Sequence, residues 1–166
     1  MGAYEELVRR HTQTAFRTAV LITGSAADAE EAVQDAFVKA HRALPRFRVG
    51  GSFRPWLLRI AGNEARNRRR AGGRRERVAL RLGAIAASGP EPGPEAQAIA
   101  AEERAGLLAA LHRLSEDDQL VIGARHLLQL SVEETAALLG IAEGTVKSRL
   151  SRALVRLRTL LEVPGA

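Results

Sequence analysis

The segment that most constrains this chain is the amphipathic stretch over residues 130–161, LSVEETAALLGIAEGTVKSRLSRALVRLRTLL. Its apolar residues recur with the spacing of two helices, and Gly140 supplies the backbone freedom that a tight turn between them needs. The second helix is apolar on one side and rich in Lys, Arg and Ser on the other. The pattern predicts a helical hairpin whose second helix is suited to a groove of DNA.

The two faces of this second helix carry different residue types. The predicted inward seam consists of Val146, Leu150, Ala153, Leu154, Leu157 and Leu161. The far face near the helix start, where a recognition helix meets base edges, carries Lys147, Ser148, Ser151 and Arg152. Arg149 projects closer to the seam, so we expect it to contact phosphate or to pack. Amphipathic hairpins are common in all-α proteins, but the basic outer face favours DNA binding.

The helix before the turn has its own start signal. Ser131 is placed to cap it, and Glu134 three residues later completes a capping box. Val132, Ala136 and Leu139 are predicted to pack inward.

The composition fits a helical protein with a polyanionic partner. Ala and Leu dominate the apolar residues of this 166-residue chain, only 4% of all residues are aromatic, and no strand-like alternation persists. The formal net charge is +6, which favours association with nucleic acid. No apolar run approaches the roughly 20 residues that a membrane span needs. We therefore expect a cytoplasmic protein without a membrane partner.

A proline- and glycine-rich segment divides the chain. Residues 83–98, GAIAASGPEPGPEAQA, contain three prolines and three glycines among small residues, which predicts a linker. The expected fold class is all-α, with two small helical domains joined by a flexible linker over residues 76–101. Residues 1–75 would form an N-terminal helical bundle, and residues 102–166 a C-terminal helix-turn-helix domain.

In the N-terminal half, Ser25 is placed to cap a helix, with Asp28 three residues on. One arc of that helix is predicted to be buried and consists of Ala29, Val33, Ala36, Phe37, Ala40 and Leu44. The opposite side carries Glu31, Gln34, Asp35, Val38 and His41. An exposed valine among acids indicates either a docking face or an ordinary solvated surface.

A further helix follows the Gly50–Gly51 break, with Ser52 as a candidate cap and Pro55 in its first turn. Its predicted inward seam is Phe53, Leu57 and Ile60. A polar stripe is formed by Arg59, Asn63, Arg66 and Arg70, with Trp56 between stripe and seam. The stripe suits a nucleic-acid backbone with a base stacked nearby. A core tryptophan beside a solvated basic face is the plainer interpretation, and these residues alone favour it.

Signals of catalysis are absent from the sequence. There is no cysteine, and neither glycine pair precedes the Gly-Lys-Ser/Thr of a phosphate loop. The four histidines are scattered, without the close pairing that is usual in a metal site. We predict no catalytic residue, no metal and no cofactor, and hence a protein that is not an enzyme.

Three motifs occur in an order typical of one family: ADAEEAVQDAFVKAHR (27–42), FRPWLLRIAGNEARNRRR (53–70) and the segment over residues 114–158. With the linker between the second and third, the chain resembles the extracytoplasmic-function (ECF) sigma factors of bacterial RNA polymerase. The resemblance covers nearly the whole chain. It implies promoter-specific transcription initiation, with core RNA polymerase (the β′ clamp helices and the β subunit) and promoter DNA as partners. An anti-sigma factor is a further candidate partner.

The resemblance also implies roles for individual residues. The positions implied to bind polymerase are Glu31, Gln34, Asp35 and Val38. Those implied to open and read the −10 element are Phe47, Phe53, Trp56, Arg59, Asn63 and Arg66. Those implied to read the −35 element are Lys147, Ser148, Arg149, Ser151 and Arg152. The alternatives are a stand-alone helix-turn-helix transcription regulator and, more distantly, a nucleic-acid-processing enzyme.

Overall fold

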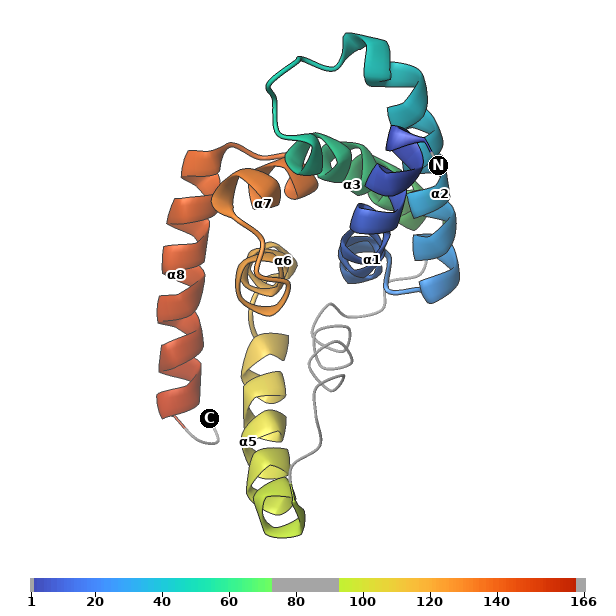
Figure 1. Cartoon of the computed structure of the whole chain (residues 1–166). Coiled ribbons are helices and arrows are strands. Elements are labelled where there is room, and N and C mark those ends of the chain that lie inside the picture. The colour runs from blue at the N-terminus through green and yellow to red at the C-terminus, as the bar shows by residue number, and fades with distance from the viewer. Residues whose placement is uncertain (1, 73–92, 164–166) are drawn as a thin grey trace.

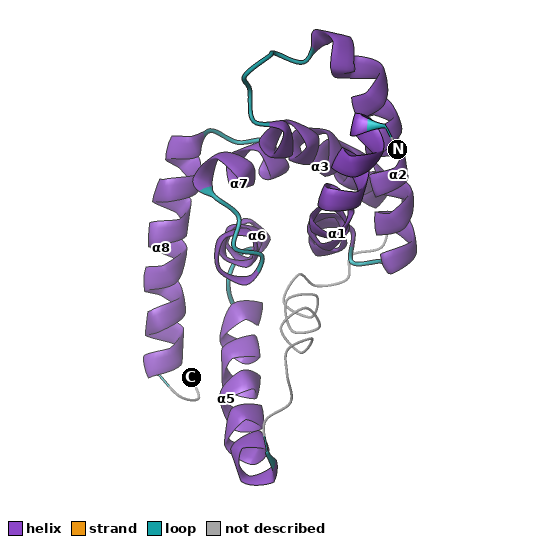
Figure 2. Cartoon of the chain, viewed as in Figure 1, coloured by secondary structure: helices purple, strands orange, loops and turns teal. Residues whose placement is uncertain are grey.

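The computed structural model describes residues 2–72 and 93–163 of the chain (Figure 1). The N-terminal part consists of α1 (Ala3–Thr23), α2 (Ala26–Ala43), the short 3-10 helix η1 (Leu44–Arg46) and α3 (Phe53–Gly72). The C-terminal part consists of α5 (Pro94–His112), α6 (Glu116–Ile122), the π-helical turn η2 (Gly123–Leu127), α7 (Val132–Leu139) and α8 (Glu143–Glu162). Figure 2 shows helices and loops but no strand in these ranges, which confirms the predicted all-α class.

The helices α1, α2 and α3 pack against one another as a bundle. α1 ends at Gly24, which takes the left-handed conformation and donates its N–H to the Val20 carbonyl at 2.9 Å. Ser25 then caps α2 by accepting the Asp28 N–H at 3.3 Å, as predicted. Because only Gly24 and Ser25 separate the two helices, α1 and α2 are held as neighbours.

Alanine makes this bundle tight. The buried alanines of the three helices are Ala15, Ala19, Ala29, Ala32, Ala36, Ala40, Ala61 and Ala65. Small side chains let helix axes approach closely, so a core with few aromatic residues still fills its space. Tyr4 closes one end, where its hydroxyl donates to the Phe37 carbonyl and burial raises the pKa of the phenol. The predicted arc of α2 is buried as expected, except that Leu44 lies in η1 and is only half-buried.

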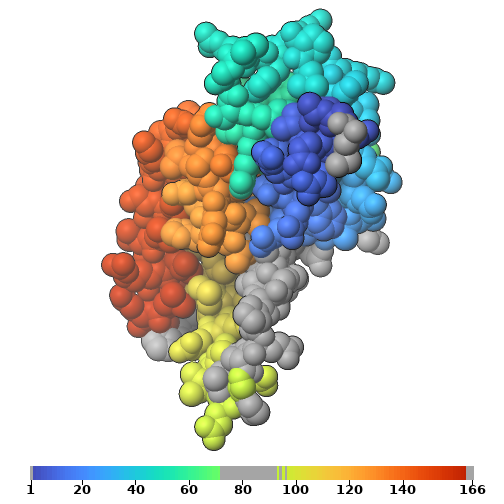
Figure 3. Space-filling view, viewed as in Figure 1, coloured from blue at the N-terminus to red at the C-terminus, as the bar shows by residue number. Residues whose placement is uncertain are grey.

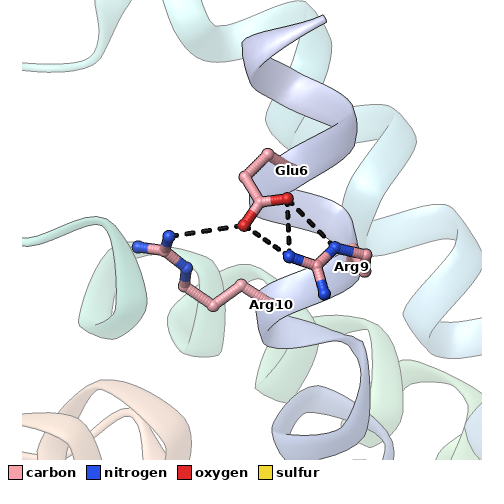
Figure 4. A network of polar contacts seen from close by, with 3 residues as sticks. All are labelled: Glu6, Arg9 and Arg10. Carbon is pink, nitrogen blue, oxygen red and sulfur yellow. Dashed lines mark hydrogen bonds and ion pairs between the residues drawn. The ribbon is translucent and has the colours of Figure 1, made fainter. Parts of the chain in front are cut away.

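The outer surface of α1 carries an ion-pair network that Figure 4 shows. Glu6 pairs with Arg9 at 2.7 Å and with Arg10 at 3.4 Å, one helical turn away. All three side chains are exposed to solvent. Such surface pairs typically contribute less than about 1 kcal/mol, so the network supports the helix without deciding the fold.

Two of the C-terminal helices, α6 and α7, begin at serine caps. Ser115 accepts the Asp118 N–H at 3.2 Å, and Ser131 accepts the Glu134 N–H at 3.0 Å. The predicted capping box at Ser131 is only half formed, because the Glu134 carboxylate pairs with Arg54 of α3 instead of returning to its own helix start. Gly140 has a φ of 69° and ends α7, so the turn of the helix-turn-helix is built as predicted.

The apolar seam of α8 is shorter than predicted. Val146 and Ala153 are buried, and Leu150 and Leu157 pack at the edge of the core. Leu154 and Leu161 are 36% and 47% exposed, so their assignment to the buried seam is wrong. Both side chains lie on parts of the α8 surface that its packing partners α5, α6 and α7 leave uncovered.

The expected linker also needs correction. Residues 76–92 lie outside the described residues, but residues 94–101 belong to α5 rather than to a flexible segment. Pro94 is the first helical residue, where its fixed φ is favourable and its missing N–H costs nothing. The following AQAIAAEERA is rich in good helix formers, so the helix continues to His112.

The two halves of the chain are in contact. α3 packs against α7, and the buried core runs continuously from α1–α3 into α6–α8. In Figure 1, α7 lies beside α3 at the level where α8 begins, and the space-filling view in Figure 3 shows the N-terminal and C-terminal residues in one continuous surface. Within the described ranges, no helix is long and apolar enough to cross a membrane.

Candidate functional site

The acidic side of α2 faces outward. Glu31, Gln34 and Val38 are exposed and Asp35 is half-buried. Val38 keeps 49% of its surface exposed beside these polar residues. The four residues predicted to bind polymerase therefore share one accessible face, as their spacing indicates.

An arginine that the sequence analysis did not single out organises this face. Arg68 of α3 donates to Asp35 Oδ2 at 2.6 Å and also forms an ion pair with Glu31. The hydrogen bond with Asp35, followed by the charge of Glu31, raises the pKa of the Arg68 guanidinium. These residues are 33 and 37 positions apart, so helix periodicity gives no signal for the contact.

The aromatic residues assigned to the −10 element lie together. The ring centroids of Phe47 and Trp56 are 4.8 Å apart, those of Phe53 and Trp56 are 5.6 Å apart, and those of Phe47 and Phe53 are 6.1 Å apart. His11 of α1 adds a fourth ring, 5.3 Å from Phe53. Trp56 is half-buried and packs against the core, so it is both a structural residue and an accessible one.

The loop between Phe47 and Phe53 stands at the rim of this aromatic cluster. Gly50 has a φ of 90°, a conformation that side chains rarely adopt, and the Gly51 N–H bonds to the Arg48 carbonyl at 2.9 Å. The turn leaves Val49 98% exposed. The loop therefore combines an exposed apolar side chain at its tip, two consecutive glycines and a neighbouring cluster of aromatic rings. Those features suit capture of an unstacked base.

The polar stripe of α3 is only partly free. Arg59, Asn63 and Arg70 are exposed, whereas Arg66 is turned toward α7. Arg66 donates to Asn63 Oδ1 at 2.6 Å and to the main-chain carbonyl of Leu138. Burial, and then the neighbouring Arg70, lowers the pKa of Arg66. Because burial and Arg70 disfavour the charged form of Arg66, an anionic or carbonyl partner would stabilise its guanidinium.

The far face of α8 is accessible along its first half. Lys147, Ser148, Ser151 and Arg152 are all exposed. Arg152 Nε donates to the Ser148 carbonyl at 3.2 Å, which holds the side chain along the helix surface. Arg149 is half-buried, nearer the seam, as predicted. A row of this kind on the second helix of a helix-turn-helix has the donors that base edges and phosphates require.

A cleft of about 850 Å³ lies between the two halves of the chain. Arg66, Arg69 and Arg70 of α3 line one wall, and Arg149 of α8 lines another. Glu116 of α6 pairs with Arg69 across it. The cleft therefore brings together arginines from both halves of the chain.

The described residues contain no group of three or more His, Asp or Glu side chains placed to hold a metal ion. The described residues instead present an acidic face on α2, an aromatic cluster with a basic stripe on α3, and a basic outer face on α8.

Comparison with known proteins decides the family. Residues 7–75 match the model for Sigma-70 region 2, and residues 104–157 match that for Sigma-70, region 4. The chain is 35% identical to the ECF RNA polymerase sigma factor SigM of Mycobacterium tuberculosis over 160 residues, 96% of this chain and 77% of SigM. The chain belongs to the ECF sigma factor family.

Other sigma factors support the assignment. The ECF RNA polymerase sigma-E factor of Escherichia coli is 40% identical over 134 residues, 76% of this chain and 70% of that protein. The structure of CnrH in complex with the cytosolic domain of CnrY has a TM-score of 0.64, with 29% identity, covering 98% of this chain and 90% of CnrH. The structure of the sigma factor RpoE from Bartonella quintana with the anti-sigma factor NepR has a TM-score of 0.58 and 27% identity. The match covers 97% of this chain and 99% of RpoE.

This ECF sigma factor directs promoter-specific transcription initiation by RNA polymerase, and a stand-alone helix-turn-helix regulator is not favoured. Sigma factors are in general initiation factors without enzymatic activity of their own. Sequence reasoning predicted three surfaces on this sigma factor. It did not single out four residues that connect its helices: Arg54, Gly62, Arg68 and Arg69.

Proposed function

We propose that the two halves of this sigma factor divide promoter recognition between them. Residues 1–75 would bind core polymerase and open and read the −10 element, while residues 102–166 would read the −35 element. The segment over residues 76–101 would join the two. The observation that carries the proposal is the presence of three separate accessible surfaces on α2, on α3 with its preceding loop, and on α8.

The docking surface is the outer face of α2, with Glu31, Gln34, Asp35 and Val38. The exposed Val38 would supply the apolar centre of the contact, and the acids around it would select a basic partner surface. Because Arg68 holds both carboxylates, the face is ordered before the partner arrives. Preorganisation of this kind lowers the entropy lost on binding.

Opening of the −10 element would use the loop and the aromatic cluster. Unstacking a base costs a few kcal/mol, and capture of that base beside Phe47, Phe53 and Trp56 would offset this cost. Arg59, Asn63 and Arg66 would hold the phosphates of the separated strand. Binding energy alone would thereby bias the duplex toward opening, with no bond broken in the DNA.

Reading of the −35 element would use Lys147, Ser148, Ser151 and Arg152 in the major groove, with Arg149 toward the backbone. A good bidentate contact between a side chain and a base discriminates by about 1–3 kcal/mol. Phosphate contacts add affinity that weakens with salt and carries no sequence information.

The structural relatives bound to CnrY and to NepR support an anti-sigma factor as a further partner of this chain. The proposal includes a cytoplasmic location, where promoter DNA and polymerase are found, and no catalytic residue, metal or cofactor in this chain.

Run-off transcription with purified core polymerase on a library of genomic promoter fragments tests the proposal. We expect discrete products that require both the chain and the polymerase. If none of the promoter fragments gives a discrete product, the proposal is refuted. Gel shifts of the same fragments without polymerase distinguish the stand-alone regulator, which must bind duplex DNA tightly by itself.

A further inference from the structure

The cleft of about 850 Å³ between the two halves of the chain has more positive than negative side chains among its described lining residues. These charged residues are Arg66, Arg69 and Arg70 of α3, Arg149 of α8, and Glu116 and Asp117 of α6. The other described residues of the lining are leucines and isoleucines. Four cations against two anions give this arginine cleft a formal charge of +2.

The size and the walls of the arginine cleft suit a small molecule. Binding sites for small ligands typically have volumes of about 300–1,000 Å³ and combine apolar walls with a few polar groups. Close packing of helices fixes part of the wall. A Cβ at Gly62 of α3 would overlap the carbonyl oxygen of Leu138, and the next residue, Leu139, lines the cleft.

Two of the four arginines have no acceptor in the part of the chain that the structure describes. Arg70 and Arg149 form no hydrogen bond and no ion pair there. Arg149 is half-buried, so part of its side chain is removed from water while its charge has no partner. A charge in that position is destabilised unless an anion meets it.

Arg66 keeps unused donors and has a like-charged neighbour. It donates to the Leu138 carbonyl and to Asn63 Oδ1, with one bond from each terminal nitrogen. A guanidinium carries five N–H groups, so others remain available. Burial, and then the charge of Arg70 one helical turn away, lowers the pKa of Arg66. An anion placed between these two arginines would offset both the burial and the repulsion.

The chemistry of the guanidinium identifies the class of anion. Arginine binds carboxylates and phosphates through pairs of parallel N–H···O bonds. A carboxylate has one charge and two oxygens, which is too few for guanidiniums that converge from two helices. A chain of phosphate groups carries several charges and more acceptor oxygens within a compact volume.

We propose that the arginine cleft binds a small anion with adjacent phosphate groups, which Arg66, Arg70 and Arg149 hold through their guanidinium groups. The apolar walls would contact the base where the ligand is a nucleotide. Glu116 opposes the anion in two ways, because its carboxylate repels phosphate and because it pairs with Arg69. The inference goes beyond promoter recognition and does not rest on the roles proposed there for Arg66 and Arg149.

Titration calorimetry of the full chain, at low salt and without divalent metal, tests the proposal with three probes: sodium tripolyphosphate, ATP and adenosine. We expect tripolyphosphate and ATP to bind at one site per chain. Adenosine lacks phosphate and should bind at least about tenfold more weakly than ATP. Several equivalent sites per chain would indicate attraction to the basic surface as a whole and would overturn the proposal. So would the absence of binding by both phosphate compounds.

Variants that remove one positive charge locate the site. Arg70→Gln and Arg149→Gln should each weaken tripolyphosphate binding by about tenfold or more, since hydrogen bonds between charged groups are strong ones. Arg59→Gln on α3 and Arg158→Gln on α8 are the matched controls, because both arginines are exposed and neither lines the cleft. The controls should change the affinity by less than about twofold. Equal losses in all four variants would overturn the proposal.

Glu116→Gln should change the affinity in the opposite direction. We expect tripolyphosphate to bind about threefold or more tightly, because the variant removes a negative charge from the cleft and releases Arg69. Glu103→Gln on α5 removes an exposed acid outside the cleft and is the control. Thermal unfolding shows that each variant is folded. Equal tightening in the two variants would mean that only net charge matters, and would overturn the placement of the anion in the cleft.

The source of the phosphate groups follows from the same titrations. Tighter binding of ATP than of tripolyphosphate identifies a nucleotide with its base on the apolar walls, and equal affinity identifies the phosphate chain alone; either result supports the site. A mixed-sequence single-stranded 20-mer gives the contrary outcome if it binds through Arg70 and Arg149 while tripolyphosphate and ATP do not. A DNA strand would then fill the cleft, and the proposal would be overturned. None of these titrations uses polymerase, so failure of the proposed function is distinguishable, because it would appear as missing run-off products.

Discussion

Arg68 of α3 reaches Asp35 of α2 with a hydrogen bond of 2.6 Å and holds Glu31 with its other terminal nitrogen. Two of the four residues assigned to polymerase binding are therefore ordered by a cation from a different helix. The contact joins the face of α2 that we propose to dock on polymerase to α3, the helix whose stripe we propose to hold DNA.

Asp35→Arg should weaken binding to core polymerase by at least about tenfold, since a loss of about 1.4 kcal/mol suffices for that. The substitution inverts the charge of the docking face and repels Arg68. Titration calorimetry with core polymerase measures the effect. Glu103→Arg, an exposed acid on α5, is the charge-matched control and should bind normally. Arg68→Ala isolates the loss of ordering. Wild-type affinity in Asp35→Arg would reject the docking face.

Arg152→Ala should reduce selection at the −35 element by about 5- to 150-fold, the range that corresponds to 1–3 kcal/mol for one base contact. Competition between promoter fragments with intact and altered −35 elements, measured with the holoenzyme, reports this ratio. Arg158→Ala removes an exposed arginine from the same helix and serves as the control. We expect both variants to bind polymerase with normal affinity. Equal selection at the −35 element by the Arg152 and Arg158 variants would show that the groove-facing assignment is wrong.

Trp56→Ala should impair promoter opening, because stacking of a base on an aromatic side chain contributes about 1–3 kcal/mol. Fluorescence of 2-aminopurine placed in the −10 element reports opening in the presence of polymerase. Trp56→Phe retains a ring beside Phe47 and Phe53 and should recover most of the signal. Phe16→Ala is a control for stability, since Phe16 of α1 also packs at the edge of the core but is not among the residues assigned to DNA. Equal opening defects in Trp56→Ala and Phe16→Ala would indicate a purely structural tryptophan.

His11 should make stability fall in mild acid. Burial lowers the pKa of His11, and so do the charges of Arg54 and Arg10, against a smaller opposite effect of Glu134. Below the usual value of about 6.5 the unfolded chain binds the proton more readily than the folded chain, so acid favours unfolding. The His11 contribution is complete above that pH and is lost as the pH falls toward the folded value.

Urea unfolding between pH 5 and pH 8 measures this dependence, and His11→Gln should flatten the profile in that range. His126→Gln, at an exposed position, should leave the profile in place. A profile that is identical in wild type and His11→Gln would contradict the prediction.

Much of the fold was predictable because its signals are local. Ser25, Ser115 and Ser131 cap helices through N–H groups three residues away, and Gly140 turns the chain with its own backbone. The inward and outward faces of α2 follow from a period of 3.6 residues. Local reasoning failed where tertiary packing leaves apolar side chains of a helix uncovered, as at Leu154 and Leu161, and where composition hid a helix start, as at Pro94.

The amino-acid sequence by itself determined the helical class and predicted which side chains share each helix face, because these features depend on periodicity and on caps and turns between residues close together in the chain. Only the tertiary structure decided how these surfaces are connected. Arg68 joins α2 to α3, and Gly62 and Arg66 meet the end of α7 across 76 and 72 residues of chain, the distance from each to Leu138. Such contacts depend on the packing of helices that are remote in the chain, and neither periodicity nor composition carries that information.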